Sequence, residues 1–121
     1  MKPVYELPIQ PPASVHGQVG HARSAGGGTE IPVYYPATGA PVSRLIEDDA
    51  AAVDAAVRSA RAAFDKGPWP GLGIEKRAEI LRACQQAMLR HADELARLEC
   101  LNTGLVLREL RSRHLVRAAY N

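Results

Sequence analysis

Cys84 and Cys100 are the two side chains of this sequence that offer thiol chemistry. Both fall in one predicted helix that runs from Gly73 to Leu101, where their 16-residue separation at about 1.5 Å per residue places them roughly 24 Å apart. A disulfide needs Cα atoms within about 7 Å, so these two cysteines are not expected to pair. The sequence instead predicts two free, buried thiols in a reducing compartment.

The histidines offer acid–base or metal chemistry. His16 and His21 lie five residues apart, with no neighbouring cysteine or aspartate to complete a metal site, so solvated histidines are expected. His91 lies at the apolar edge of the predicted helix, seven residues after Cys84. It could serve as a ligand or a base, but we see no carboxylate placed to orient it, and a boundary histidine is the favoured interpretation.

The glycine run Gly26–Gly28 is a candidate for a loop that binds phosphate. It matches neither Gly-x-x-x-x-Gly-Lys-Ser/Thr nor the Gly-x-Gly-x-x-Gly turn that joins a strand to a helix, and it leads into a predicted strand. A hinge is the favoured interpretation, and no cofactor-binding motif is present.

Four arginines lie in the last predicted helix, residues 105–121, and could meet phosphates or a carboxylate-rich partner. Without interleaved aromatic residues, a solvated basic face is the favoured interpretation. The formal net charge of +2 is too small to indicate a nucleic-acid or membrane partner. The four are Arg108, Arg111, Arg113 and Arg117.

Length and composition limit the fold. The chain has 121 residues, room for one domain, and alanine supplies much of its apolar content beside a single Phe and a single Trp. No run approaches the roughly 18 apolar residues of a membrane span. The N-terminus lacks the continuous apolar segment of a secretory signal, so a cytoplasmic location is the default expectation.

Local patterns predict the elements that would position these side chains. Proline and glycine punctuate residues 1–28, which favours neither helix nor sheet and predicts a flexible arm. Two β-prone runs, 31–35 and 42–46, flank turn residues 36–41 and predict a β-hairpin. The expected fold is therefore this arm, one hairpin and then three α-helices, mainly helical, with residues 29–121 as the folded region.

Three helical segments follow the hairpin. Asp48 or Asp49 can cap the first helix, whose apolar residues recur at steps of three and four, and the Gly67–Gly71 segment with its two prolines ends it. The long helix comes next, with Gly104 as a left-handed cap. Ion pairs Arg90/Glu94 and Asp93/Arg97 are expected along it.

Together these segments resemble the N-terminal region of the aldehyde dehydrogenase family, from about residue 30 to residue 120. The Tyr-Pro-Ala-Thr-Gly sequence looks more like the betaine aldehyde branch than the others. The segments that carry the resemblance are 35–39, 53–57, 60–64, Trp69, 77–81, 93–96 and 98–104.

The resemblance implies an α/β fold of which this chain is the N-terminal, cofactor-side part. It also implies NAD(P)-dependent oxidation of an aldehyde to an acid, in which a thiolate attacks the carbonyl and a glutamate activates water. In the family the nucleophilic cysteine lies in a Gly-Gln-x-Cys sequence, C-terminal to the segments that match here. No catalytic or cofactor-binding residue is therefore assigned in this chain. Cys84 and Cys100 stand on motifs that the family uses for packing.

The resemblance further implies a monovalent cation site, for K⁺ or Na⁺. Main-chain oxygens at Val33 and Tyr34 and the side chain of Asn102 match the family's ligands, but the family has an aspartate at that last position and usually a lysine where Leu105 stands. A neutral amide predicts weaker binding. The alternative is that Asn102 only helps to end the helix.

Two functions are therefore open. The chain is either a truncated part of such an enzyme, inactive alone and a homo-oligomer at full length, or a helical interaction module that binds a protein partner. The first predicts exposed apolar stripes on two helices, because in the family these helices pack against a domain that lies beyond the chain.

Overall fold

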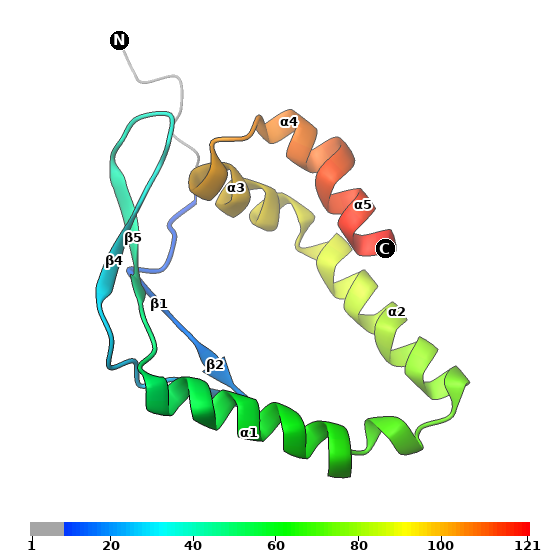
Figure 1. Cartoon of the computed structure of the whole chain (residues 1–121). Coiled ribbons are helices and arrows are strands. Elements are labelled where there is room, and N and C mark those ends of the chain that lie inside the picture. Colours follow the sequence, from blue (N-terminus) through cyan, green and yellow to red (C-terminus); the bar gives the residue numbers. More distant parts are fainter. Residues whose placement is uncertain (1–8) are drawn as a thin grey trace.

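The computed structural model describes residues 9–121. A small sheet lies at one end of the molecule, and the helices run away from it and back along an open path (Figure 1). The chain is mainly helical, as predicted. The first eight residues of the predicted arm lie outside the described part.

The predicted hairpin is confirmed. Strand β4 (Glu30–Tyr34) pairs antiparallel with β5 (Pro41–Ile46). The connecting turn is closed by the N–H of Tyr35, which donates to the carbonyl of Ala40 at 2.9 Å. Gly39 has a φ of 70°, a conformation that glycine adopts without steric cost.

The expectation that residues 1–28 form neither helix nor sheet is wrong between residues 14 and 23. Strand β1 (Ser14–His16) lies parallel beside β5 and completes a sheet of order β1-β5-β4. Strands β2 (Gln18–Val19) and β3 (Ala22–Arg23) form a second, two-stranded ladder. Local proline and glycine content did not reveal β1, because its hydrogen-bond partners lie about thirty residues later in the chain.

Ser24 joins this segment to the connection between β5 and the first helix. Its buried hydroxyl donates to Oδ1 of Asp48, and its N–H donates to the carbonyl of Gly17 at 2.8 Å. The glycine run that follows is irregular, with positive φ at Gly26 and Gly27, and the N–H of Gly28 donates to the carbonyl of Glu47 at 3.0 Å. Residues 14–28 are thus bonded to the end of β5 and the start of the helix.

Helix α1 (Ala50–Lys66) begins and ends as predicted. Asp49 is the N-cap, and its Oδ1 accepts from the N–H of Ala52 at 2.8 Å. Gly67 ends the helix, and a short 3₁₀ turn (Trp69–Gly71) leads to the next one. Helix α1 contacts β2, but none of its residues is buried.

The predicted long helix is two helices, α2 (Ile74–Arg90) and α3 (Ala92–Thr103). The backbone leaves helical geometry at His91, with φ −101° and ψ 13°. No glycine or proline marks the break, so the sequence carries no local signal that one helix ends there and another begins. The predicted separation of about 24 Å between the cysteines assumed one continuous helix, so it does not apply to this structure. Both thiols are free, as expected.

The last helical run is bent by a π turn. Helix α4 (Leu107–Glu109) continues through the π turn (Leu110–His114) into α5 (Leu115–Tyr120). Gly104, with a φ of 73°, is the predicted left-handed cap of α3 and starts the connection to this run.

The hydrophobic core lies where the π turn meets α3. The core cluster consists of Ala96, Cys100 and Leu110, with Leu107 and Leu115 packed against it. Helix α5 also contacts α2, which brings the end of the chain back beside the middle of the molecule (Figure 1). This cluster is small, so each of its members carries a large share of the packing.

We expect Leu110→Ala to lower the free energy of unfolding by about 2–5 kcal/mol, because the side chain is only 1% exposed and its loss leaves a cavity. Urea denaturation followed by circular dichroism measures this change. The matched control is Leu105→Ala on the exposed connection, which should change the value by less than about 0.5 kcal/mol. Equal effects would contradict this location of the core.

Candidate functional site

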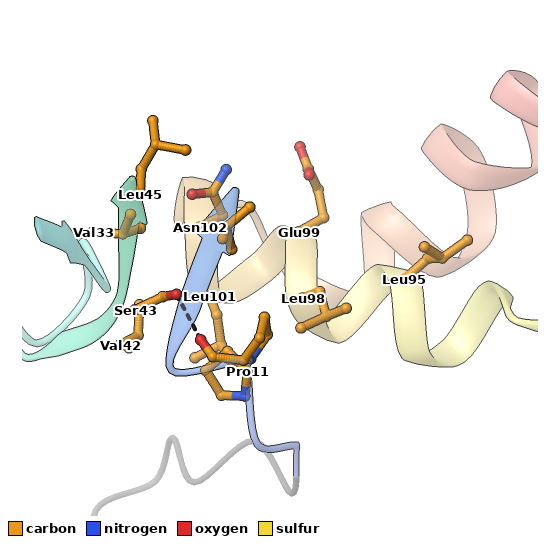
Figure 2. Close-up of a pocket in the computed structure, with 12 residues that line it drawn as sticks. Pro11, Val33, Val42, Ser43, Leu45, Leu95, Leu98, Glu99, Leu101 and Asn102 are labelled. Carbon is orange, nitrogen blue, oxygen red and sulfur yellow. Dashed lines mark hydrogen bonds between the residues drawn. The ribbon is translucent and has the colours of Figure 1, made fainter. Parts of the chain in front are cut away.

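An apolar cavity of about 440 Å³ lies between the sheet and α3. Figure 2 shows its walls: strands β1, β4 and β5 on one side, α3 on the other, and the chain before β1 crossing beneath. The hydroxyl of Ser43 donates to the carbonyl of Pro12 at 2.6 Å and holds that chain against β5. The lining residues are Pro11, Pro12, Val15, Val33, Val42, Ser43, Leu45, Leu95, Leu98, Glu99, Leu101 and Asn102.

The structure brings together two of the three residues expected at a cation site. Val33 and Asn102 both line this cavity, from β4 and from the end of α3. Tyr34 does not line it and is 52% exposed. The ladder between β4 and β5 is irregular between Val33 and Tyr34, which is where the expected main-chain ligands lie. The cation site stays a prediction.

The hydrogen bonds at the end of α3 come from the two residues that follow Asn102. Thr103 donates its hydroxyl to the carbonyl of Glu99 at 2.7 Å, and the N–H of Gly104 donates to the carbonyl of Cys100 at 2.9 Å. Within residues 9–121 the Asn102 side chain makes no hydrogen bond. The alternative interpretation, in which this amide only ends the helix, therefore has no hydrogen bond to support it.

The main charged cluster joins α3 to the π turn. Nε of Arg97 donates to Oδ2 of Asp93 at 2.8 Å, as predicted, and Arg111 pairs with Oδ1 of the same carboxylate. The hydrogen bond from Arg97 is the largest cause that holds the pKa of Asp93 below its usual range. Desolvation opposes it, and Arg111 adds to it. Of the four arginines expected to form a solvated basic face, Arg111 therefore forms an ion pair between the π turn and α3.

Two expectations about histidine are wrong. Nδ1 of His91 lies 3.3 Å from Oε2 of Glu94, so a carboxylate does orient it, and this contact replaces the expected pair of Glu94 with Arg90. Both side chains are exposed, so a boundary histidine remains the better interpretation. His16 is half-buried in β1 rather than solvated, and its Nδ1 has no hydrogen-bond partner among the described residues.

The two thiols differ. Cys100 is buried in the core, as predicted, whereas Cys84 is exposed on α2, which corrects the expectation of a buried thiol. The helical pattern around Cys84 is apolar, but within residues 9–121 no side chain covers it. Within residues 9–121 no three His, Cys, Asp or Glu side chains gather as a multidentate metal site requires.

Comparison with known proteins decides the family. The family model described as "Aldehyde dehydrogenase family" matches residues 22–120. The chain belongs to the aldehyde dehydrogenase family. This confirms the resemblance inferred from segments 35–104, and extends it back to β3.

Individual relatives agree with this assignment. The chain is 35% identical over 103 residues to the mitochondrial benzaldehyde dehydrogenase of Antirrhinum majus, covering 82% of this chain and 19% of that protein. It is 38% identical over 98 residues to the betaine aldehyde dehydrogenase of Cereibacter sphaeroides, covering 81% of this chain and 20% of that protein. It is 45% identical over 69 residues to the 2-hydroxymuconic semialdehyde dehydrogenase of Pseudomonas sp., covering 57% of this chain and 14% of that protein.

The chain spans about a fifth of the length of the curated relatives it matches.

No helix of the described residues is long and apolar enough to cross a membrane. The sequence did not point to the apolar walls that α3 gives the cavity, Leu95 and Leu98. Helical spacing alone does not show that a sheet faces them.

We expect the stability of the Asp93→Asn variant to differ from that of the parent in a pH-dependent way. A carboxyl whose folded pKa is depressed stabilises the fold above the ordinary Asp pKa of about 3.9, and this contribution is lost as pH falls through the folded pKa. The variant should be less stable at neutral pH, and the two unfolding curves should converge in acid. Urea denaturation at stepped pH values measures this.

The companion variant is Arg111→Gln, which removes one partner of the same carboxylate. The Asp93→Asn and Arg111→Gln effects should be less than additive in the double variant, because they remove one shared interaction. Strict additivity, or a stability difference that does not change with pH, would contradict the assigned role of the cluster.

Proposed function

We propose that this chain is the opening segment of an NAD(P)-dependent aldehyde dehydrogenase and acts as scaffold rather than as the reacting part. The observation that supports this most strongly is the family match across residues 22–120, in a chain that lacks the Gly-Gln-x-Cys sequence. The whole enzyme would convert an aldehyde, water and NAD(P)⁺ to the carboxylic acid, NAD(P)H and a proton. Neither thiol of this chain takes part in that reaction.

The substrate class proposed for the whole enzyme includes betaine aldehyde. The Tyr35–Gly39 turn supports this, and so does the similarity to the betaine aldehyde dehydrogenase of Cereibacter sphaeroides. Other relatives are named for benzaldehyde and for 2-hydroxymuconic semialdehyde, so the activity test includes an aromatic aldehyde as well. A cytoplasmic, homo-oligomeric whole enzyme is part of the same proposal.

A monovalent cation at the hairpin also belongs to this proposal. Val33 on β4 and the free amide of Asn102 on α3 line one cavity, so an ion there would join the sheet to the helix. Oxygen ligands from carbonyl and amide groups suit a hard cation such as K⁺ or Na⁺. The neutral amide offers weaker binding than an aspartate in its place.

A second candidate function, an interaction module that binds a protein partner, is favoured by the uncovered apolar side chains of α1 and α2. Size-exclusion chromatography separates the two. A stable monomer or a defined hetero-complex supports the module, whereas aggregation of the isolated chain supports a part that needs the remainder of its enzyme.

We expect the purified 121-residue chain to show no NAD(P)-dependent turnover of betaine aldehyde or benzaldehyde, because neither of its thiols lies in the family's nucleophile motif. Absorbance at the wavelength of NAD(P)H measures the reaction. A full-length betaine aldehyde dehydrogenase assayed in parallel is the positive control. Turnover well above the buffer rate, lost when Cys84 and Cys100 are replaced by serine, would contradict the proposed scaffold role.

We expect Asn102→Asp to gain stabilisation by monovalent cations, because it adds a carboxylate to the predicted oxygen ligands. At a salt concentration several times Kd the gain should be about 1 kcal/mol, seen as a higher melting temperature in KCl or NaCl than in tetramethylammonium chloride. The control is Asn121→Asp, which adds the same charge at the far end of the chain. Equal responses of the two variants would contradict the site.

A further inference from the structure

The cavity between the sheet and α3 holds two polar side chains that have no partner. Every residue that lines it is apolar except Ser43, Glu99 and Asn102. The hydroxyl of Ser43 already donates to the carbonyl of Pro12. Among the described residues, neither the Glu99 carboxylate nor the Asn102 amide makes a hydrogen bond or an ion pair. They lie three residues apart on one side of α3, so both are available to a single ligand (Figure 2).

No cationic side chain balances the Glu99 carboxylate within residues 9–121. The lining of the cavity contains no lysine, arginine or histidine. Arg97, two residues away on α3, donates to Asp93, and Arg44 on β5 pairs with Glu30. The cavity therefore carries one negative charge that its own walls do not compensate.

This charge and the size of the cavity together define the ligand. An anion would be repelled by the carboxylate, and a neutral apolar molecule would displace water from it without replacing the lost hydrogen bonds. A bare inorganic ion satisfies the carboxylate but leaves most of the 440 Å³ between the apolar walls unfilled. The ligand that fits both features is a cation with an apolar body.

The hydrogen-bonding groups of the cavity select the kind of cation. The carboxylate oxygens of Glu99 only accept hydrogen bonds, and Oδ1 of Asn102 accepts as well. A primary ammonium offers three N–H donors, whereas a quaternary ammonium offers none. We propose that this cavity binds a small primary alkylammonium ion, whose N–H groups donate to Glu99 and Asn102. The alkyl chain of the ligand packs against the apolar walls from β1 and α3.

This ligand goes beyond the proposed oxidation of an aldehyde, because it gives the cavity a binding role of its own. It shares Asn102 with the proposed K⁺ or Na⁺ site, so the two kinds of cation exclude each other at that amide. Binding of the organic ion is therefore measured in a buffer whose only other cation is tetramethylammonium, which has no N–H to donate.

The test is a titration of the full 121-residue chain, labelled with ¹⁵N, with n-hexylammonium chloride. The amide signals of cavity residues such as Val33, Leu98 and Asn102 should shift and saturate with a Kd of about 1 mM or tighter. Methylammonium lacks the body and 1-hexanol lacks the charge, so each should bind at least about tenfold more weakly. Shifts that do not saturate, or equal affinity for either comparison compound, overturn the proposal.

The charged partner is tested with Glu99→Gln, which keeps the shape of the side chain and removes its charge. The affinity for hexylammonium should fall at least about tenfold. The matched control is Glu75→Gln, because Glu75 is an equally exposed carboxylate on α2, outside the cavity. It should bind like the parent, and circular dichroism shows whether both variants are folded. Equal affinities of the two variants overturn the proposal.

The apolar walls are tested with Val15→Thr, which replaces a methyl group by a hydroxyl at almost constant volume. The affinity for hexylammonium should fall about threefold, because the chain then packs against a polar group. Val53→Thr on α1 is the control, since Val53 is exposed like Val15 but lies outside the cavity lining. Equal affinities of these two variants would mean that the alkyl chain does not contact the walls, which contradicts the proposed binding mode.

Thermal unfolding of the dilute chain gives a second readout. Hexylammonium at several times its Kd should raise the melting temperature of the parent and leave that of Glu99→Gln almost unchanged. An equal rise in both, or none in the parent, overturns the proposal. Neither measurement involves turnover of an aldehyde, so the ligand site and the proposed function can fail separately.

Discussion

The packing of Leu110 against Ala96 and Cys100 is the contact on which the rest of this chain depends. It joins α3 to the C-terminal helical run, and it is the place where the described residues bury a large side chain almost completely. Neither α1 nor α2 contains a buried residue. Their positions therefore follow from their connections and from half-buried contacts with neighbouring elements, and not from a shared hydrophobic core.

Polar contacts fix orientation where apolar burial is scarce. At the core, the carboxylate of Asp93 holds arginines from α3 and from the π turn, so the same junction is packed and ion-paired. At the other end, Ser24 and Asp48 join the first strands to the start of α1. Such contacts are directional but contribute little net stability when exposed, which is consistent with a segment whose larger apolar surfaces lie elsewhere.

Family membership gives these features a common physical meaning. The chain spans about a fifth of the relatives it matches. In the proposed enzyme, the apolar side chains at its surface would face the remainder of the fold. The cavity between the sheet and α3 has mostly apolar walls, and the Glu99 and Asn102 side chains lie beside them (Figure 2).

Much of the local structure was predictable, because it rests on backbone chemistry that a few neighbouring residues determine. The turn between β4 and β5, the Asp49 cap, the end of α1 at Gly67 and the left-handed cap at Gly104 all follow from residues whose φ range or hydrogen-bonding groups admit few conformations. The family itself was also identified from the order and spacing of short segments.

Tertiary structure decided what depends on residues far apart in the chain. The break at His91 carries no glycine or proline signal, and it places Ala96 and Cys100 where they meet Leu110. Strand β1 forms because β5 offers it a free edge. Cys84 is exposed because none of the described residues covers a side of α2 that its sequence pattern predicted to be buried. Periodicity shows that a helix has an apolar side, but only the packed structure shows which sides are buried, because burial depends on the partner and not on the helix alone.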